Sequence, residues 1–170
     1  MIYSVLRRGM VPVTVDKKTQ YVGYGVDDMI TRYSVYDSSE PVEYVGHLDL
    51  QDTKNGVKVL YIQNENPEKY KHFADVADQI EVEHCLKRNI NNPYISSVAA
   101  RDTYAMHYRR GKRFINEGAN VYLESITKDL KKGERVTTDF LGYQKMYMPI
   151  NMLNKMKEKI KLNPLLKDIK

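Results

Sequence analysis

The sequence contains little cysteine, tryptophan or phenylalanine, and it has no long apolar run. Its 170 residues include one Cys, no Trp and three Phe. The single thiol, Cys85, excludes an internal disulfide and any zinc site built from several thiolates. No stretch approaches the roughly 18–20 consecutive apolar residues that a membrane helix needs, and the first residues lack the apolar core of a secretory signal. We therefore expect a cytoplasmic protein with no membrane partner.

The length and composition are those of one folded domain. Hydrophobic residues make up 42% of the chain and charged residues 29%, which is typical of a globular protein rather than a disordered one. The chain has no internal repeat, no low-complexity stretch and no linker rich in Pro, Gly or Ser. We expect a single domain over residues 1–170.

The positive charge is concentrated in the last quarter of the chain. The net charge is +5, but residues 1–127 hold 16 basic and 17 acidic side chains, whereas residues 128–170 hold 11 and 5. Net basic charge permits an anionic partner such as a nucleic acid or a phosphorylated cofactor. The region that could attract one electrostatically is therefore the C-terminal segment.

Tyrosine is the overrepresented residue, with 14 copies. Tyrosine suits strands that are half buried, with the ring inside and the hydroxyl in water. It also suits surfaces that bind bases or other flat ligands. Both interpretations stay open at the level of the sequence.

The first elements that the pattern predicts are three strands. Segments 29–36 and 42–50 alternate roughly between apolar and polar residues, and the turn-forming residues 37–41 join them as a hairpin. Asn55-Gly56 then supplies a tight reversal, for which we expect a positive φ, into a strand over 57–63.

Helical spacing begins after the third strand. Pro67 and the apolar residues Phe73, Val76, Ala77 and Ile80 predict a helix over 67–89, whose apolar stripe changes direction after Ile80. The pattern then predicts a strand over 94–100, a helix capped by residue 102 or 103 that runs to about 114, strands over 121–127 and 138–149, and a basic amphipathic helix over 150–162.

This order predicts an α/β fold in which a mixed, mostly antiparallel sheet has helices on both faces. Two segments carry a more specific likeness, 57–76 (VKVLYIQNENPEKYKHFADV) and 95–114 (ISSVAARDTYAMHYRRGKRF). In their strand, loop and helix order they resemble the GNAT superfamily of N-acetyltransferases, with a likeness that spans roughly residues 27–150. The resemblance implies transfer of an acetyl group from acetyl-CoA to an amine, without a metal.

The resemblance also implies roles for individual residues. Tyr108 would act as the acid that protonates the leaving thiolate, and Glu65 as the base that deprotonates the amine. Backbone N–H groups at Tyr61, Ile62 and Gln63 would polarise the thioester carbonyl. The remaining positions implied to contact the cofactor are Lys69, Lys71, His72, Phe73, Ala74 and Arg109.

The cofactor loop diverges from the family pattern. Glycines normally let the backbone approach the pyrophosphate, whereas this chain has no glycine between Gly56 and Gly111. The densest basic cluster, 108–114 (YRRGKRF), suits CoA phosphates, nucleic acid or a solvated helix end equally well.

Each candidate residue also has a plain structural interpretation. Tyr108 suits helix packing, and Glu65 suits a solvated turn. Cys85 follows His84 like a nucleophile beside a base, but adjacent helical residues point about 100° apart, which favours a structural cysteine. The four histidines show no metal-binding spacing, so we expect no metal.

A second function therefore stays open. The chain would be a non-catalytic module of the same fold that binds a protein or a nucleic acid through the basic residues 150–162. That hypothesis depends on the exposed charge of Lys155, Lys157, Lys159 and Lys161.

Overall fold

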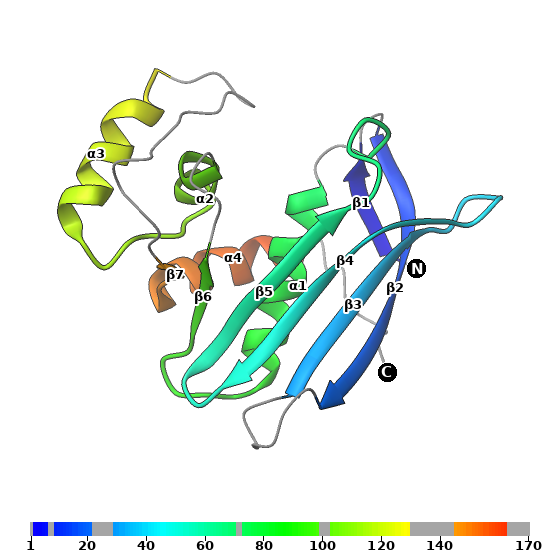
Figure 1. Ribbon diagram of the computed structural model, residues 1–170, viewed down its shortest axis with the longest axis horizontal. Helices are drawn as coiled ribbons and strands as arrows, with labels where there is room; N and C mark the ends of the chain where they lie inside the picture. The colour runs from blue at the N-terminus through cyan, green and yellow to red at the C-terminus, as the bar shows by residue number, and fades with distance from the viewer. Residues whose placement is uncertain are drawn as a thin grey trace.

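A mixed β-sheet organises the computed structural model, which describes residues 2–6, 9–21, 29–70, 73–98, 103–129 and 145–162 (Figure 1). Within these residues, seven strands lie side by side in chain order. Every neighbouring pair is antiparallel except β5 and β6, which are parallel. The predicted α/β class with a mixed, mostly antiparallel sheet is confirmed. The strands are β1 (Ile2–Leu6), β2 (Gly9–Tyr21), β3 (Met29–Asp37), β4 (Glu43–Thr53), β5 (Gly56–Asn64), β6 (Tyr94–Val98) and β7 (Lys145–Met148).

The described helices pack in two groups. Helices α1 (Phe73–Lys87) and α4 (Ile150–Leu162) contact each other and share the main core with Leu48, Val57 and Ile95 of the sheet. Helices α2 (Tyr104–Arg109) and α3 (Glu117–Thr127) enclose a smaller core with Met146 of β7. Figure 1 shows this second group beyond the β6 end of the sheet.

The three strands predicted from alternation are present as β3, β4 and β5. The reversal between β4 and β5 is also present, but neither Asn55 nor Gly56 has the positive φ that we expected. Gly56 is needed for a different reason, because a Cβ at that position would lie 1.9 Å from the backbone oxygen of Tyr94 on β6. Two backbones approach there more closely than any side chain allows.

Helix α1 begins at Phe73, so the predicted start at residue 67 is wrong. Residues 67–69 form a turn in which the Lys69 and Tyr70 amides donate to the carbonyl of Asn66 (3.2 and 2.9 Å). The predicted apolar face of α1 is buried as expected. Its change of direction after Ile80 has a packing reason, since α1 also contacts α4 and carries buried charges that face the segment after α2.

The next predicted helix is shorter than expected. Helix α2 ends at Arg109 instead of about residue 114, because the chain turns at Gly111, which has a φ of 92°. The strand expected over 94–100 is present as β6 up to Val98, and residues 99–102 lie outside the described residues.

The strand predicted over 121–127 is wrong, because this segment belongs to helix α3. The Asn116 side chain caps the helix by accepting from the Ala119 amide (3.3 Å). Ala119 and Leu123, four residues apart, are buried in the second core, whereas Val121 is 65% exposed. Residues 121–127 alternate briefly as a strand does. The pattern of that segment alone shows neither the Asn116 cap nor the i, i+4 pair of Ala119 and Leu123.

The C-terminal elements agree with the sequence where they are described. The strand expected over 138–149 is present as β7, and residues 130–144 lie outside the described residues. Helix α4 has the predicted bounds, with Leu153 buried, Ile150 and Met156 packed against the core, and Lys155 and Lys157 exposed.

Two strands at the N-terminus were not predicted. β1 and β2 extend the sheet beyond β3, and β2 pairs with β3 over residues 13–21. Residues 16–20 of β2 are all polar, so they show no alternation between apolar and polar side chains. β2 is therefore defined by its pairing with β3 and not by its local sequence pattern. None of the helices in the described part of the chain combines the length and apolarity needed to cross a bilayer.

Candidate functional site

The parallel pair β5 and β6 separates partway along its length. Pairing runs from Gly56 opposite Tyr94 to Val59 opposite Ser97, and β6 ends one residue later. β5 continues over residues 60–64, and Figure 1 shows the two strands diverging. An edge of β5 is thereby left without a partner among the described β6 residues, at the carboxyl ends of two parallel strands.

A β-bulge explains the separation. Val59 lies opposite Leu50 and Tyr61 lies opposite Asp49, so Leu60 is an extra residue in β5. A bulge bends its strand and increases the local twist. This one lies directly after the last pair with β6, so β5 turns away from β6 at that point. Leu60 itself is 38% exposed.

The backbone of β5 after the bulge has a defined orientation. The Glu65 amide donates to the Val45 carbonyl on β4 (2.9 Å). Successive N–H groups of a strand point to opposite edges, so the Gln63 amide also points toward β4 and the Ile62 amide points toward the opening. Of the three predicted carbonyl-polarising groups, the N–H of Ile62 is the one directed at the space beside β6.

The side chains around this stretch of β5 differ in exposure. The Tyr61 ring is 51% exposed, the Ile62 side chain packs against the main core, and the Gln63 side chain is half buried. Glu65 is exposed just after the strand. A carboxylate in this position is open to solvent and to an incoming substrate, as a base for an external amine requires.

The loop from β5 to α1 is anchored to the sheet by Tyr70. The Tyr70 hydroxyl donates to Asp37 (3.1 Å) and to Glu43, and the Asn64 side chain donates to the Tyr70 carbonyl (2.6 Å). Lys69 forms an ion pair with Glu43 and lies over the Tyr70 ring. The charge of Lys69 is therefore already engaged.

The predicted phosphate-binding residues do not form one group. Lys71 and His72 lie outside the described residues, and Phe73 is buried in the main core. Ala74 is half buried in the first turn of α1, whereas Arg109 of α2 donates to the Thr127 carbonyl of α3 (3.1 Å). Of the described candidates, only Ala74 is a half-buried residue at the start of α1.

Arg110 is a residue that the sequence reasoning did not single out. Its guanidinium pairs with Asp75 in the first turn of α1 (2.8 Å) and with Asp78 one turn later. Burial raises the pKa of Asp78, and the charges of Arg110 and Lys112 oppose that shift. The acidic first turn of α1 therefore carries its own counter-ion, supplied by the end of α2.

A fully buried ion pair lies next to this contact. Glu81 Oε2 of α1 is 3.1 Å from Lys112 Nζ, and both side chains have no exposed surface. Burial raises the pKa of Glu81 to about 7. His107 is half buried, and the burial of its imidazole lowers its pKa to about 3, with help from the charges of Lys112 and Arg110. The Glu81 and Lys112 pair joins α1 to the segment that follows α2 without contact with solvent.

Tyr108, the predicted acid, lies on α2 against the second core. The Arg113 guanidinium carbon lies 3.9 Å from the centre of the Tyr108 ring. Among the described residues no hydrogen bond or ion pair links Tyr108 to Glu65. The two candidates come from separate elements that border the same end of the β5 and β6 pair.

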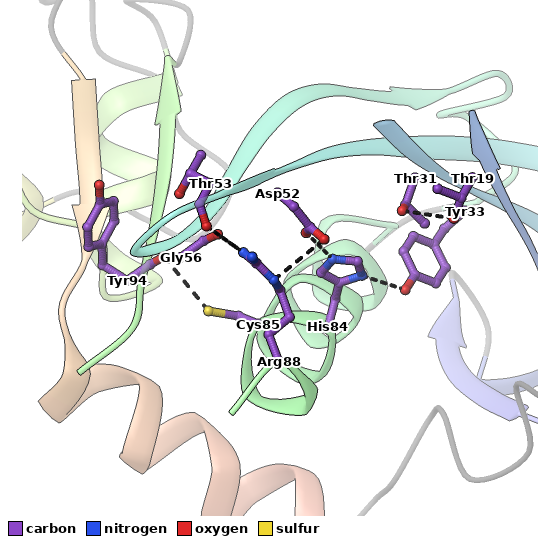
Figure 2. Close-up of polar contacts among 10 residues, drawn as sticks. All are labelled: Thr19, Thr31, Tyr33, Asp52, Thr53, Gly56, His84, Cys85, Arg88 and Tyr94. Carbon is purple, nitrogen blue, oxygen red and sulfur yellow. Dashed lines mark hydrogen bonds and ion pairs between the residues drawn. The ribbon is translucent and has the colours of Figure 1, made fainter. Parts of the chain in front are cut away.

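A second polar cluster, shown in Figure 2, contains the cysteine and histidine that are adjacent in sequence. His84 Nε2 lies 2.7 Å from Asp52 Oδ1, and His84 Nδ1 lies 2.7 Å from the Tyr33 hydroxyl. The Cys85 thiol donates instead to the Tyr94 carbonyl (3.8 Å), and burial raises its pKa to about 11. Since both imidazole nitrogens are engaged elsewhere, this geometry favours the structural interpretation of Cys85.

We expect His84→Leu to lower the free energy of unfolding by about 2 kcal/mol, because it leaves the buried Tyr33 hydroxyl and Asp52 without their shared partner. Urea denaturation measures this. Adding Tyr33→Phe removes the orphaned hydroxyl and is expected to recover part of the loss. Additive losses would contradict the assigned coupling.

The contribution of His84 to the stability of the fold depends on pH. Burial lowers the pKa of His84, against the opposing hydrogen bond to Asp52. Below its unfolded value of about 6.5, the unfolded chain binds a proton that the folded chain excludes, so this contribution to stability is lost as pH falls. His84→Leu is expected to remove that slope.

The comparisons with known proteins add no family. Neither a scan of protein-family models nor a search of curated proteins finds a match for this chain. Within the described residues, no group of three or more His, Cys, Asp or Glu side chains is arranged to hold a metal ion. What the fold and the site define is an α/β protein with a parallel strand pair that opens beside two helices.

Proposed function

We propose that this protein is a divergent N-acetyltransferase of the GNAT type, which transfers an acetyl group from acetyl-CoA to an amine. The observation that carries the proposal is the parallel β5 and β6 pair, which ends at Val59 and Ser97 while β5 continues to Asn64. An extended thioester arm can add to the free edge of β5 as a further strand would, through backbone hydrogen bonds.

The residues at the opening can perform the reaction without a covalent enzyme intermediate. The Ile62 N–H points toward the position where it would donate to the thioester oxygen as negative charge develops. The amine nitrogen attacks the carbonyl carbon and the carbon–sulfur bond breaks. Glu65 accepts the proton that the amine loses, and Tyr108 donates a proton to the departing thiolate.

Binding of the cofactor is tested by thermal unfolding. A ligand that binds the folded state must raise the unfolding temperature by mass action. We expect acetyl-CoA and CoA at millimolar concentration to stabilise the chain by a few degrees, and adenosine without a phosphate to have a smaller effect. If neither acetyl-CoA nor CoA raises the unfolding temperature, the enzyme proposal fails.

The acidic start of α1 gives a sharper prediction. If the cofactor phosphates lie beside the first turn of α1, Asp75→Asn is expected to tighten CoA binding about three- to tenfold, because it removes a repelling charge and leaves Arg110 with Asp78 as its one remaining carboxylate partner of the two. Isothermal titration calorimetry measures the change. Glu117→Gln makes the same charge change in the first turn of α3 and serves as the control, with no effect on affinity. Equal effects of the two substitutions would place the phosphates elsewhere.

The non-catalytic module remains the second candidate. It is favoured by Lys155 and Lys157 on α4, whose side chains are exposed. A chain that shows no CoA-dependent stabilisation and binds an anionic partner through these lysines, with strong salt dependence, would support it over the enzyme.

A further inference from the structure

The face of the sheet opposite α1 carries two groups of contacting aromatic rings. Tyr33 and Leu48 lie opposite each other and point toward α1, since the Tyr33 hydroxyl contacts His84. Alternate residues of a strand point to opposite faces, so Arg32 and Ser34 of β3 point away from α1, as do their partners Asp49 and His47. We call this the outer face of the sheet.

Four rings on the outer face form what we call the ring ladder: Tyr36, Tyr44, His47 and Tyr61. They come from β3, β4 and β5, and successive ring centres are 5.4, 6.5 and 5.5 Å apart. Tyr44 is 40% exposed and Tyr61 is 51% exposed, whereas His47 is buried between them. The hydroxyl of Tyr44 is held by His47 Nδ1 at 2.8 Å, which fixes its ring. The ladder presents two exposed, oriented aromatic rings on a rigid sheet.

A second ring pair continues the outer face toward the β7 edge. Tyr147 pairs with Ser96, which lies opposite Lys58 of β5, so all three share this face. The Tyr94 and Tyr147 rings contact each other edge to face, with centres 5.6 Å apart. Figure 2 shows the Tyr94 ring extending away from α1. Six rings therefore line one face of the sheet.

Basic side chains outnumber acidic ones on the outer face. Register places four basic side chains there and two acidic ones, and the exposed carboxylate of Glu65, just after β5, adds a negative charge near Tyr44. One of the acids in register, Asp49, is neutralised by Arg32 through two hydrogen bonds of 2.7 and 2.6 Å. Lys18 and Lys145 are exposed, and Lys58 is half buried. The basic residues in register are Lys18, Arg32, Lys58 and Lys145, and the acidic ones in register are Asp16 and Asp49.

We propose that the outer face is a binding surface for single-stranded nucleic acid. Unpaired bases stack on exposed Tyr44 and Tyr61, while the basic side chains on either side of the ladder contact the phosphates. Exposed rings between basic side chains are the combination that single strands need, because every base has a π-face and every linkage carries a negative charge. Duplex bases are already stacked, so a duplex gains only the phosphate contacts. This surface is separate from the α4 lysines, and it adjoins the proposed thioester site, with which it shares Tyr61 of β5.

Fluorescence anisotropy of the full chain with labelled 12-nucleotide oligo-dT and oligo-rU tests the proposal, with a duplex of equal length as competitor. We expect single strands to bind at least tenfold tighter than the duplex. Tyr44→Ala and Tyr61→Ala are each expected to weaken binding about 5- to 100-fold. Tyr61→Phe keeps the ring and is expected to bind like the parent chain, which separates stacking from loss of fold.

Charge variants and controls complete the design. Lys18→Gln and Lys58→Gln are expected to weaken binding and to reduce the slope of log affinity against log salt by about one each. Tyr122→Ala, a 38% exposed tyrosine on α3, and the pair Lys155→Gln with Lys157→Gln are expected to change little. Absence of binding at low salt, equal affinity for the duplex, or loss of binding through the α4 lysines alone would each overturn the proposal. Oligonucleotide binding without CoA binding would leave this surface intact and refute the enzyme.

Discussion

Lys112→Met is expected to destabilise the protein by about 3–5 kcal/mol at neutral pH, the largest effect of any single substitution that we consider. It removes the partner of Glu81, whose side chain is fully buried 3.1 Å from Lys112 Nζ. A buried carboxylate without its counter-ion must be charged in a low-dielectric interior or take up a proton. Guanidinium denaturation measures the loss.

The loss is expected to depend on pH with a definite sign. The pKa of Glu81 is already raised by burial from 4.5 to about 7, and Lys112 is the main group that opposes that rise. In the parent chain, folded Glu81 therefore holds a proton that the unfolded chain has released, and its contribution to stability falls as pH rises from about 4.5 to about 7.

Without Lys112 the pKa of folded Glu81 rises further, so the Glu81 carboxyl holds its proton more tightly. The cost of Lys112→Met relative to the parent chain should therefore shrink to about 1 kcal/mol near pH 5, where Glu81 is neutral in both. The matched control is Glu81→Leu with Lys112→Met, which replaces both charges and should recover most of the stability at pH 7. A loss independent of pH would show that packing, and not charge, is what Lys112 supplies.

Gly56→Ala is expected to cost about 3 kcal/mol, because the new Cβ would lie 1.9 Å from the Tyr94 carbonyl oxygen. That atom belongs to the backbone of β6, so no side-chain rotation can relieve the clash. Relief requires that β5 and β6 move apart at the first of their four paired positions. Thermal and urea unfolding measure the loss.

Gly118→Ala is the control for this substitution. Gly118 lies in α3, and its Cβ would meet only the Asn116 side chain, at 3.2 Å. Alanine favours a helix over glycine, so the change should stay within about 1 kcal/mol. Comparable losses from the two substitutions would refute the close approach of β5 and β6. If β5 and β6 also hold the thioester, Gly56→Ala should weaken CoA binding, whereas Gly118→Ala should not.

Much of the fold is encoded locally and could be predicted. Alternation defined β3, β4 and β5, and helical spacing defined the buried face of α1 and the full extent of α4. A strand at the edge of a core must alternate and a helix against it must repeat every three to four residues, whatever surrounds them. For the candidate site, the sequence predicted only the location, which is beside β5. The order of strand, helix and strand implied that β5 and β6 are parallel, and so indicated that place.

Other features depend on contacts between distant residues. Local alternation misassigned α3, whose cap and buried face involve Asn116 and the second core, and it missed β2, which is defined by pairing with β3. Arg110 looked like one more basic residue in the cluster 108–114, but the fold places it against Asp75 and Asp78. No spacing rule links residues more than 30 positions apart.

The sequence by itself therefore determined the class of the fold, the single thiol and the excess of tyrosine. Tertiary structure decided what these residues do. It placed Cys85 against a carbonyl instead of a base, it buried Glu81 with Lys112, and it opened β5 from β6 at the bulge of Leu60. It also gathered six rings on one sheet face. The physical reason is that burial, ion pairing and strand register arise only when separate segments meet, whereas periodicity is a property of each segment alone.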